Sequence, residues 1–184
     1  TEKFPLNIDD LQNALSLWPN LKELSDALIQ QYSLISKAWH RLIFDNGHVT
    51  LTLLIGDVNE SLPKLKGVID AWFLDGFSPA KNPDMWQASL FESMAKHSHS
   101  ETTFATFTSA GEVRRGLQHT GFKVSKAPGF GKKREMLFGQ YQGGANNTQE
   151  ETNRKTVIVI GGGLAGAASA EAMVRRGYQV TLIE

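Results

Sequence analysis

The sequence predicts an α/β protein, and three patterns carry this prediction. Runs of β-forming residues alternate along the chain with segments of helical periodicity, which is typical of strands connected through helices. The apolar run 68–74 (VIDAWFL) is typical of a strand that is covered on both faces of a parallel sheet. Residues 156–183 show a strand, a glycine-rich turn, a helix and a second strand in succession. Together these patterns favour a largely parallel, Rossmann-like sheet.

The N-terminal part of the chain is predicted to contain two helices followed by two strands. Apolar residues recur at helical spacing after Asn7 or Asp9, and Pro19 is suited to begin the second helix. Two β-rich runs, 40–44 and 49–55, then flank an Asp-Asn-Gly turn.

Strands and helices are expected to alternate in the next part of the chain, up to about residue 140. In chain order they are a short helix over 61–65, the strand 68–74, a helix over 85–96, a strand over 102–108, a helix over 110–120 that Gly121 ends, and two last strands over 122–125 and 135–140.

Composition restricts the class of protein. The chain has 184 residues, no cysteine and a formal net charge of +0. The absence of cysteine excludes a disulfide scaffold and cysteine metal sites, and it fits a reducing, cytoplasmic compartment. No apolar stretch approaches the roughly 20 residues that cross a bilayer, and no signal peptide is recognised, so no membrane association is expected. A neutral chain is not attracted to nucleic acid as a whole, so any such contact must be a local patch.

The two ends of the chain and one change in composition predict a fragment with two domains. The chain opens on Thr1 without a methionine and closes on the strand 180–184, so we expect it to be part of a longer protein. Residues 142–154 contain no large apolar residue, which is typical of a linker. We therefore expect a first domain over 1–141, this linker, and the start of a second domain over 155–184.

The second domain is predicted to begin with a dinucleotide-binding motif. In the stretch GGGLAG, Gly161 allows the tight turn, Gly163 lets a pyrophosphate approach the helix N-terminus, and Gly166 lets helix and strand pack closely. Glu184, about 20 residues on, can accept hydrogen bonds from ribose hydroxyls and would repel the 2′-phosphate of NADP. An unliganded glycine-rich turn is the alternative, and the spacing does not separate NAD from FAD.

GGGLAG followed by Glu184 resembles the FAD site of flavoproteins related to glutathione reductase and to amine oxidases. The resemblance implies that FAD is the cofactor of the second domain. A single βαβ unit cannot bury its own faces, so we expect residues 155–184 to be poorly stable without the rest of their sheet.

Polar side chains follow several predicted strands of the first domain, and ligands of open α/β sheets bind at the carboxyl ends of the strands. Three carboxylates on one edge suit a nucleoside-like ligand together with a reactive amine. The polar strand ends are Glu2, Asp57, Asp75 and Thr108-Ser109.

This order of elements resembles the second part of a Rossmann-like S-adenosylmethionine-dependent methyltransferase, which ends in a helix and an antiparallel strand pair. The resemblance implies that Glu2 binds the ribose of S-adenosylmethionine, that Asp57 reaches its adenine amine, and that Asp75 lies at the catalytic edge. The first strand and glycine-rich loop of that family would precede Thr1. The fragment alone is therefore expected to bind the cofactor poorly and to be inactive.

Four stretches carry a closer resemblance, which covers nearly the whole chain: EKFPL at 2–6, DAWFLDGFSPAKNPDMW at 70–86, ATFTSAGEVRRGLQHTGF at 105–122 and GFGKKREML at 129–137. They resemble the bacterial family of bifunctional enzymes that make 5-methylaminomethyl-2-thiouridine in tRNA. The resemblance implies that an FAD domain removes the carboxymethyl group from 5-carboxymethylaminomethyl-2-thiouridine at the wobble position. A methyltransferase domain then methylates the freed aminomethyl group. It implies tRNA as the partner and no obligate protein partner.

Asp75 is the predicted catalytic residue. A primary amine is mostly protonated near neutral pH, and only its neutral form attacks a methyl group. A carboxylate can accept an N–H hydrogen bond, orient the lone pair and help take the proton. The alternative is that Asp75 only caps the loop or the following helix.

The loop after Asp75 is predicted to contact the substrate. Two prolines restrict its course, and its predicted substrate-binding residues are Phe77, Lys81 and Trp86. Phe77 or Trp86 can wall the pocket or stack on the base, and packing in the core or loop is the alternative for both.

Lys132, Lys133 and Arg134 form a basic patch that can hold tRNA phosphates, with a solvated loop as the alternative. The histidines show no metal-ligand spacing, so no metal is expected. Two other functions stay open: a small-molecule amine methyltransferase fused to a flavin oxidase, and a non-catalytic nucleotide- or tRNA-binding module.

Overall fold

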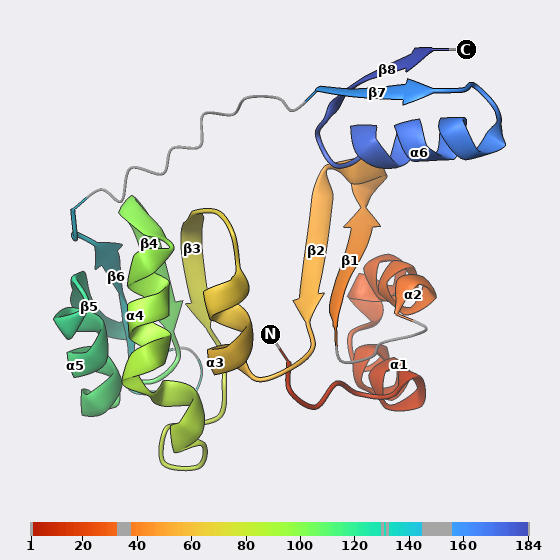
Figure 1. Ribbon diagram of the computed structural model, residues 1–184. Helices are drawn as coiled ribbons and strands as arrows, with labels where there is room; N and C mark the ends of the chain where they lie inside the picture. The colour runs from red at the N-terminus through yellow and green to blue at the C-terminus, as the bar shows by residue number, and fades with distance from the viewer. Residues whose placement is uncertain (1, 33–37, 130, 132, 145–155, 184) are drawn as a thin grey trace. The chain divides into compact units, whose positions relative to one another are not determined.

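The computed structural model describes residues 2–32, 38–129, 131, 133–144 and 156–183. The chain divides into two compact units, one formed by residues 1–3 and 56–148 and the other by residues 4–55 and 149–184. Figure 1 shows the elements of both. Most of the predicted linker 142–154 lies outside the described residues.

The first unit contains a mixed sheet in the order β3-β4-β6-β5. Its strands are β3 (Ile69–Leu74), β4 (Ser98–Thr106), β5 (Phe122–Pro128) and β6 (Glu135–Tyr141). β3 and β4 are parallel, whereas β6 is antiparallel to both β4 and β5. The periodicity alone predicted a parallel sheet, which is wrong for β5 and β6. The loop between those two strands is too short for the crossover that a parallel pair needs.

The helices of this unit begin later or earlier than the sequence predicted, for local reasons. The short helix α3 (Val58–Ser61) begins early because Asp57 caps it, and the 3₁₀ turn η3 (Leu62–Lys64) continues it. α4 (Ala88–Lys96) begins late because the 3₁₀ turn η4 (Pro83–Trp86) precedes it. α5 (Gly111–His119) ends as predicted before Gly121, whose φ of +98° is unfavourable for other residues.

One face of this sheet carries the core. α4 and α5 pack against it, as Figure 1 shows, and β3 contributes Trp72 and Leu74. The other face leaves Phe73 81% exposed and Phe138 42% exposed. The expectation that strand 68–74 is covered on both faces is therefore wrong for the part of the unit that the structure describes. The buried cluster is Leu62, Leu74, Trp86, Leu90, Phe91, Met94, Phe104, Val113, Leu117, Phe122, Leu137 and Tyr141.

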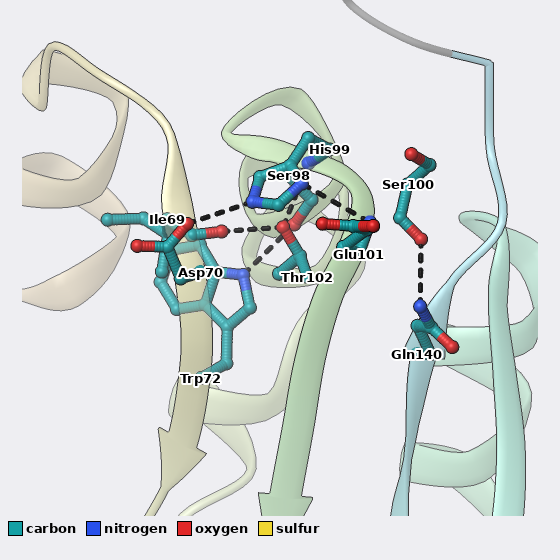
Figure 2. Close-up of polar contacts among 9 residues, drawn as sticks. All are labelled: Ile69, Asp70, Trp72, Ser98, His99, Ser100, Glu101, Thr102 and Gln140. Atoms are coloured by element: carbon teal, nitrogen blue, oxygen red, sulfur yellow. Dashed lines mark hydrogen bonds and ion pairs between the residues drawn. The ribbon is translucent and has the colours of Figure 1, made fainter.

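A register shift marks the beginning of the parallel pair. Ile69 lies opposite Ser98, but Ala71 lies opposite Thr103, so β4 carries extra residues there. The Thr102 hydroxyl donates a hydrogen bond of 2.5 Å to the Ile69 carbonyl and closes the bulge (Figure 2). This hydroxyl therefore holds the two strands together at the end of the sheet where β3 begins.

The N-terminal part of the second unit has the predicted elements. α1 (Ile8–Ser16), the 3₁₀ turn η1 (Pro19–Leu21) and α2 (Lys22–Gln31) precede the antiparallel strands β1 (Trp39–Phe44) and β2 (Val49–Leu54). The Asn7 side chain caps α1. Between the strands, the turn η2 (Asp45–Gly47) has positive φ at Asn46 and Gly47, the residue types that tolerate it.

The C-terminal part of this unit is a βαβ unit, as predicted. β7 (Thr156–Ile160) and β8 (Gln179–Ile183) are parallel, and α6 (Leu164–Val174) connects them. No residue of α6 is buried, and Leu164 at its start is 92% exposed. The helix thus buries little apolar surface, and the poor stability of this segment without the rest of its sheet stays a prediction.

Candidate active site

Asp75 lies on the wall of a pocket at the carboxyl end of β3. The pocket has a volume of about 350 Å³. Among the described residues that line it, Asp75 and Lys133 are ionisable, and most of the others are apolar. A carboxylate beside apolar side chains interacts more strongly with an amine than one in bulk water does. The lining residues are Phe73, Leu74, Asp75, Ala105, Thr106, Phe107, Gly129, Lys133 and Met136.

The loop after Asp75 is held by its own backbone and by a buried indole. The Ser78 carbonyl accepts the N–H groups of Lys81 at 2.8 Å and Asn82 at 3.0 Å. The Trp86 indole N–H donates to the Phe77 carbonyl at 2.9 Å, and Trp86 is only 7% exposed. These contacts fit the packing alternative for Trp86, because its ring belongs to the core cluster.

The other predicted contacts of this loop face solvent. The Phe77 ring is 75% exposed, and Lys81 is exposed. A Cβ at Gly76 would meet only the flexible end of the Met85 side chain, which can move aside. Hydrogen bonds thus hold the backbone of the loop, while the side chains of Phe77 and Lys81 are exposed.

Lys133 comes to the pocket from the loop between β5 and β6. Its ammonium lies 5.3 Å from the centre of the Phe107 ring, within the range of a cation–π interaction. Gly129 allows this loop to fold back, because a Cβ there would meet the backbone and side chain of Lys133. Arg134 is exposed, and Lys132 lies outside the described residues. The sequence indicated a basic patch but not that Lys133 lines the same pocket as Asp75.

The end of β4 contributes Thr106, which sequence reasoning missed. Its hydroxyl donates a hydrogen bond of 2.9 Å to the Leu74 carbonyl, one residue before Asp75. The neighbouring pair that the sequence did indicate, Thr108-Ser109, lies just beyond. No local pattern could single out Thr106, because its partner is 32 residues away.

Glu2 and Asp57 come together at a second place in the first unit. The Gly56 N–H donates to the Glu2 carbonyl at 2.9 Å, so the two acidic residues flank one backbone contact. Lys3 donates a hydrogen bond of 2.9 Å to the Asp57 carboxylate, and the Asn59 N–H donates another of 2.9 Å. The hydrogen bond from Lys3, followed by the one from Asn59, holds the pKa of Asp57 below its usual range.

This lowered pKa predicts a pH-dependent contribution to stability. The contribution is fully present above the ordinary Asp value of about 3.9 and is lost as the pH falls through the lower folded-state pKa. Asp57→Asn keeps the helix cap but removes the charge. We expect it to lower the urea midpoint slightly at pH 7 and to match the wild type near pH 2, as followed by tryptophan fluorescence. An equal deficit at both pH values would contradict a contribution from charge.

The glycine-rich turn has the geometry that its motif predicts. Gly161 has a φ of +104°, and its N–H donates to the Ile183 carbonyl at 2.7 Å. A Cβ at Gly166 would collide with the Gly161 carbonyl oxygen. Gly163 precedes α6 and has open space around its Cβ position. Glu184 lies outside the described residues.

The described residues contain no helix that is both long and apolar enough to cross a membrane. They also contain no cluster of three or more histidine, cysteine, aspartate or glutamate residues that could hold a metal ion.

Comparisons with known proteins point in one direction. Residues 19–142 match the family model described as S-adenosyl-L-methionine-dependent methyltransferase. The tRNA 5-methylaminomethyl-2-thiouridine biosynthesis bifunctional protein MnmC of Methylobacillus flagellatus is 53% identical over 100% of this chain and 28% of its own length. The protein of the same name from Chromobacterium violaceum is 52% identical over 100% of this chain and 29% of its own length. The chain thus spans less than a third of the length of these curated relatives.

A crystal structure of MNMC2 from Aquifex aeolicus has a similar fold. The TM-score is 0.52 with 23% sequence identity, over 64% of this chain and 36% of that one. At this identity the likeness supports the Rossmann-like α/β fold and nothing finer.

Proposed function

Because the chain belongs to the S-adenosyl-L-methionine-dependent methyltransferase family, we propose that it methylates a primary amine in the pocket beside Asp75. The names of its relatives suggest the acceptor. It is the aminomethyl group of a 2-thiouridine at the wobble position of tRNA, and the product is 5-methylaminomethyl-2-thiouridine. This substrate implies that the protein acts in the cytoplasm.

The observation that carries the proposal is the position of Asp75 in a largely apolar pocket. The Asp75 carboxylate accepts a hydrogen bond from the substrate amine and turns the nitrogen lone pair toward the methyl group. It then takes the proton that the nitrogen must lose.

The residues proposed to bind the methyl donor, Glu2 and Asp57, are carboxylates that can accept hydrogen bonds from a nucleoside. S-adenosylmethionine supplies a methyl group that is activated by a positive sulfur. Glu2 is proposed to accept hydrogen bonds from the ribose. Asp57 already accepts bonds from Lys3 and from two groups of Asn59. A carboxylate has about four acceptor sites, so one remains for the adenine amine.

One proposed tRNA contact, Lys133, lines the pocket and supplies a positive charge there. Arg134, which is exposed, and Lys132 are proposed as further contacts to the phosphates. The exposed Phe77 ring is available to stack on an unpaired base, while Trp86 supports the loop from inside. Lys81, also exposed, is proposed as a further contact.

A second activity is proposed for the protein as a whole. Residues 1–141 form the methyltransferase part, 142–154 a linker, and 155–184 the start of an FAD-dependent oxidoreductase domain. That domain removes the carboxymethyl group before methylation. Gly161 and Gly163 fit the pyrophosphate of FAD, because their backbone leaves room at the helix N-terminus, and Gly166 lets the turn lie close to the helix. Glu184 is proposed for the ribose.

The acceptor is tested by methyl transfer from labelled S-adenosylmethionine. The assay uses a protein that carries this chain at the full length of its relatives. We expect label in tRNA that contains the aminomethyl uridine and none in tRNA with an unmodified wobble uridine. Transfer to free amines but not to tRNA would favour a small-molecule methyltransferase. Tight tRNA binding without any transfer would favour a non-catalytic module.

A further inference from the structure

The last rung of the parallel ladder between β3 and β4 lies beside Asp75. Leu74 and Thr106 are its partners, and both are buried. The hydrogen bond from the Thr106 hydroxyl to the Leu74 carbonyl therefore acts where the ladder stops holding the chain. The next residue is Asp75, whose own side chain is exposed to the pocket.

Thr106 is itself held in place. The Thr108 N–H donates to the Thr106 hydroxyl oxygen at 3.4 Å, and the Ala110 N–H donates to the Thr108 hydroxyl oxygen at 3.2 Å. Thr106 is 3% exposed and Thr108 is 8% exposed. A row of hydrogen bonds thus runs from the beginning of α5 to the carbonyl that precedes Asp75.

The chain on the other side of Asp75 is held as well. The Trp86 indole bonds to the Phe77 carbonyl, two residues after Asp75. The short segment that carries the carboxylate is therefore fixed at both sides by buried side chains. Such supports matter because a small displacement of a reacting group lowers the rate strongly.

We propose that Thr106 is a positioning residue for Asp75: its hydroxyl fixes the Leu74 carbonyl and thereby the direction of the carboxylate in the pocket. This inference rests on the proposed function, in which Asp75 accepts the proton of the substrate amine. Thr106 does not touch the amine in this scheme. It acts only through the backbone that carries Asp75.

Thr106→Val tests this idea because valine has nearly the same shape but lacks the hydroxyl. The Leu74 carbonyl then loses the hydrogen bond from the hydroxyl, and the Thr108 N–H loses its acceptor, while the packing stays nearly the same. The full-length protein is assayed with tRNA that contains the aminomethyl uridine. We expect kcat to fall about tenfold, with KM for tRNA and for S-adenosylmethionine unchanged. Thr106→Ser, which restores a hydroxyl, is expected to recover most of kcat.

The other end of the same strand pair offers a matched control. Thr102 is also buried, and its hydroxyl also donates to a carbonyl of β3, that of Ile69 (Figure 2). Thr102→Val should lower stability about as much as Thr106→Val, yet leave kcat unchanged. An equal loss of kcat in both variants would mean that stability alone is involved, and it would overturn the inference.

A double variant that carries Thr106→Val and Asp75→Asn distinguishes failure of this inference from failure of the proposed role of Asp75. If Thr106 acts through Asp75, Thr106→Val lowers kcat no further in the Asp75→Asn protein. A further loss of the same size would mean that Thr106 acts independently, against the inference. An inactive Asp75→Asn protein beside a fully active Thr106→Val protein would overturn this inference alone. Full activity of Asp75→Asn would overturn the proposed role of Asp75 and this inference with it.

Discussion

Asp75→Asn is expected to lower kcat for methyl transfer about a hundredfold or more, the range of general base catalysis. Asparagine keeps the size of the side chain and a carbonyl oxygen for the hydrogen bond, but it cannot take the proton. The loss should shrink as the pH rises toward about 10, where a growing share of an alkyl amine is neutral without help. The measurement is the pH profile of kcat with tRNA that contains the aminomethyl uridine.

Asp84→Asn is a suitable control for this prediction. Asp84 is another exposed aspartate of the same loop, and the Asn59 side chain donates to its backbone carbonyl rather than to its carboxylate. We expect it to keep normal kcat. Asp75→Asn with full methyl transfer and an unchanged pH profile would show that Asp75 is a loop cap, the alternative that the sequence left open.

Gly166→Ala is expected to weaken FAD binding by the full-length protein about ten- to a hundredfold. The added methyl group meets the Gly161 carbonyl oxygen, so the turn and the start of α6 must separate. Overpacking of this kind costs about 1–3 kcal/mol. The measurement is the flavin absorbance of the purified protein, with titration of added FAD.

The same variant separates the two proposed activities. Methyl transfer to tRNA that already carries the aminomethyl group should be unchanged, because the glycine-rich turn belongs to the proposed oxidoreductase domain and not to the proposed methyltransferase domain. Gly144→Ala is the matched control, since a Cβ at Gly144 meets nothing. Normal flavin content in Gly166→Ala would argue against a dinucleotide site at this turn.

Much of the fold followed from local patterns in the sequence. The βαβ unit at 156–183 was predicted with its glycine turn, because the glycines there are required by the local backbone conformation or by close packing. The strand that ends before Asp75 was also predicted, since an apolar run that stops at a carboxylate is visible without a structure. Helix ends were less accurate, because the caps and 3₁₀ turns around Asp57 and Pro83 shift them by a few residues.

The candidate site was predicted only in part. Asp75 could be chosen from its place after a strand, and Glu2 and Asp57 from the resemblance to methyltransferases. Trp86 could be either a base contact or a core residue, and burial decides for the core. Thr106 had no distinguishing mark in the sequence.

Local patterns were enough to predict which segments become strands and helices, where a carboxylate follows a strand, and where a glycine-rich turn precedes a helix. These features depend on neighbouring residues and on backbone preferences. The folded chain was needed to show that Thr106 bonds to Leu74, that Lys133 shares a pocket with Asp75, and that β6 lies between β4 and β5. Those relations join residues far apart in the chain, and they form only when one face of the sheet is buried against α4 and α5.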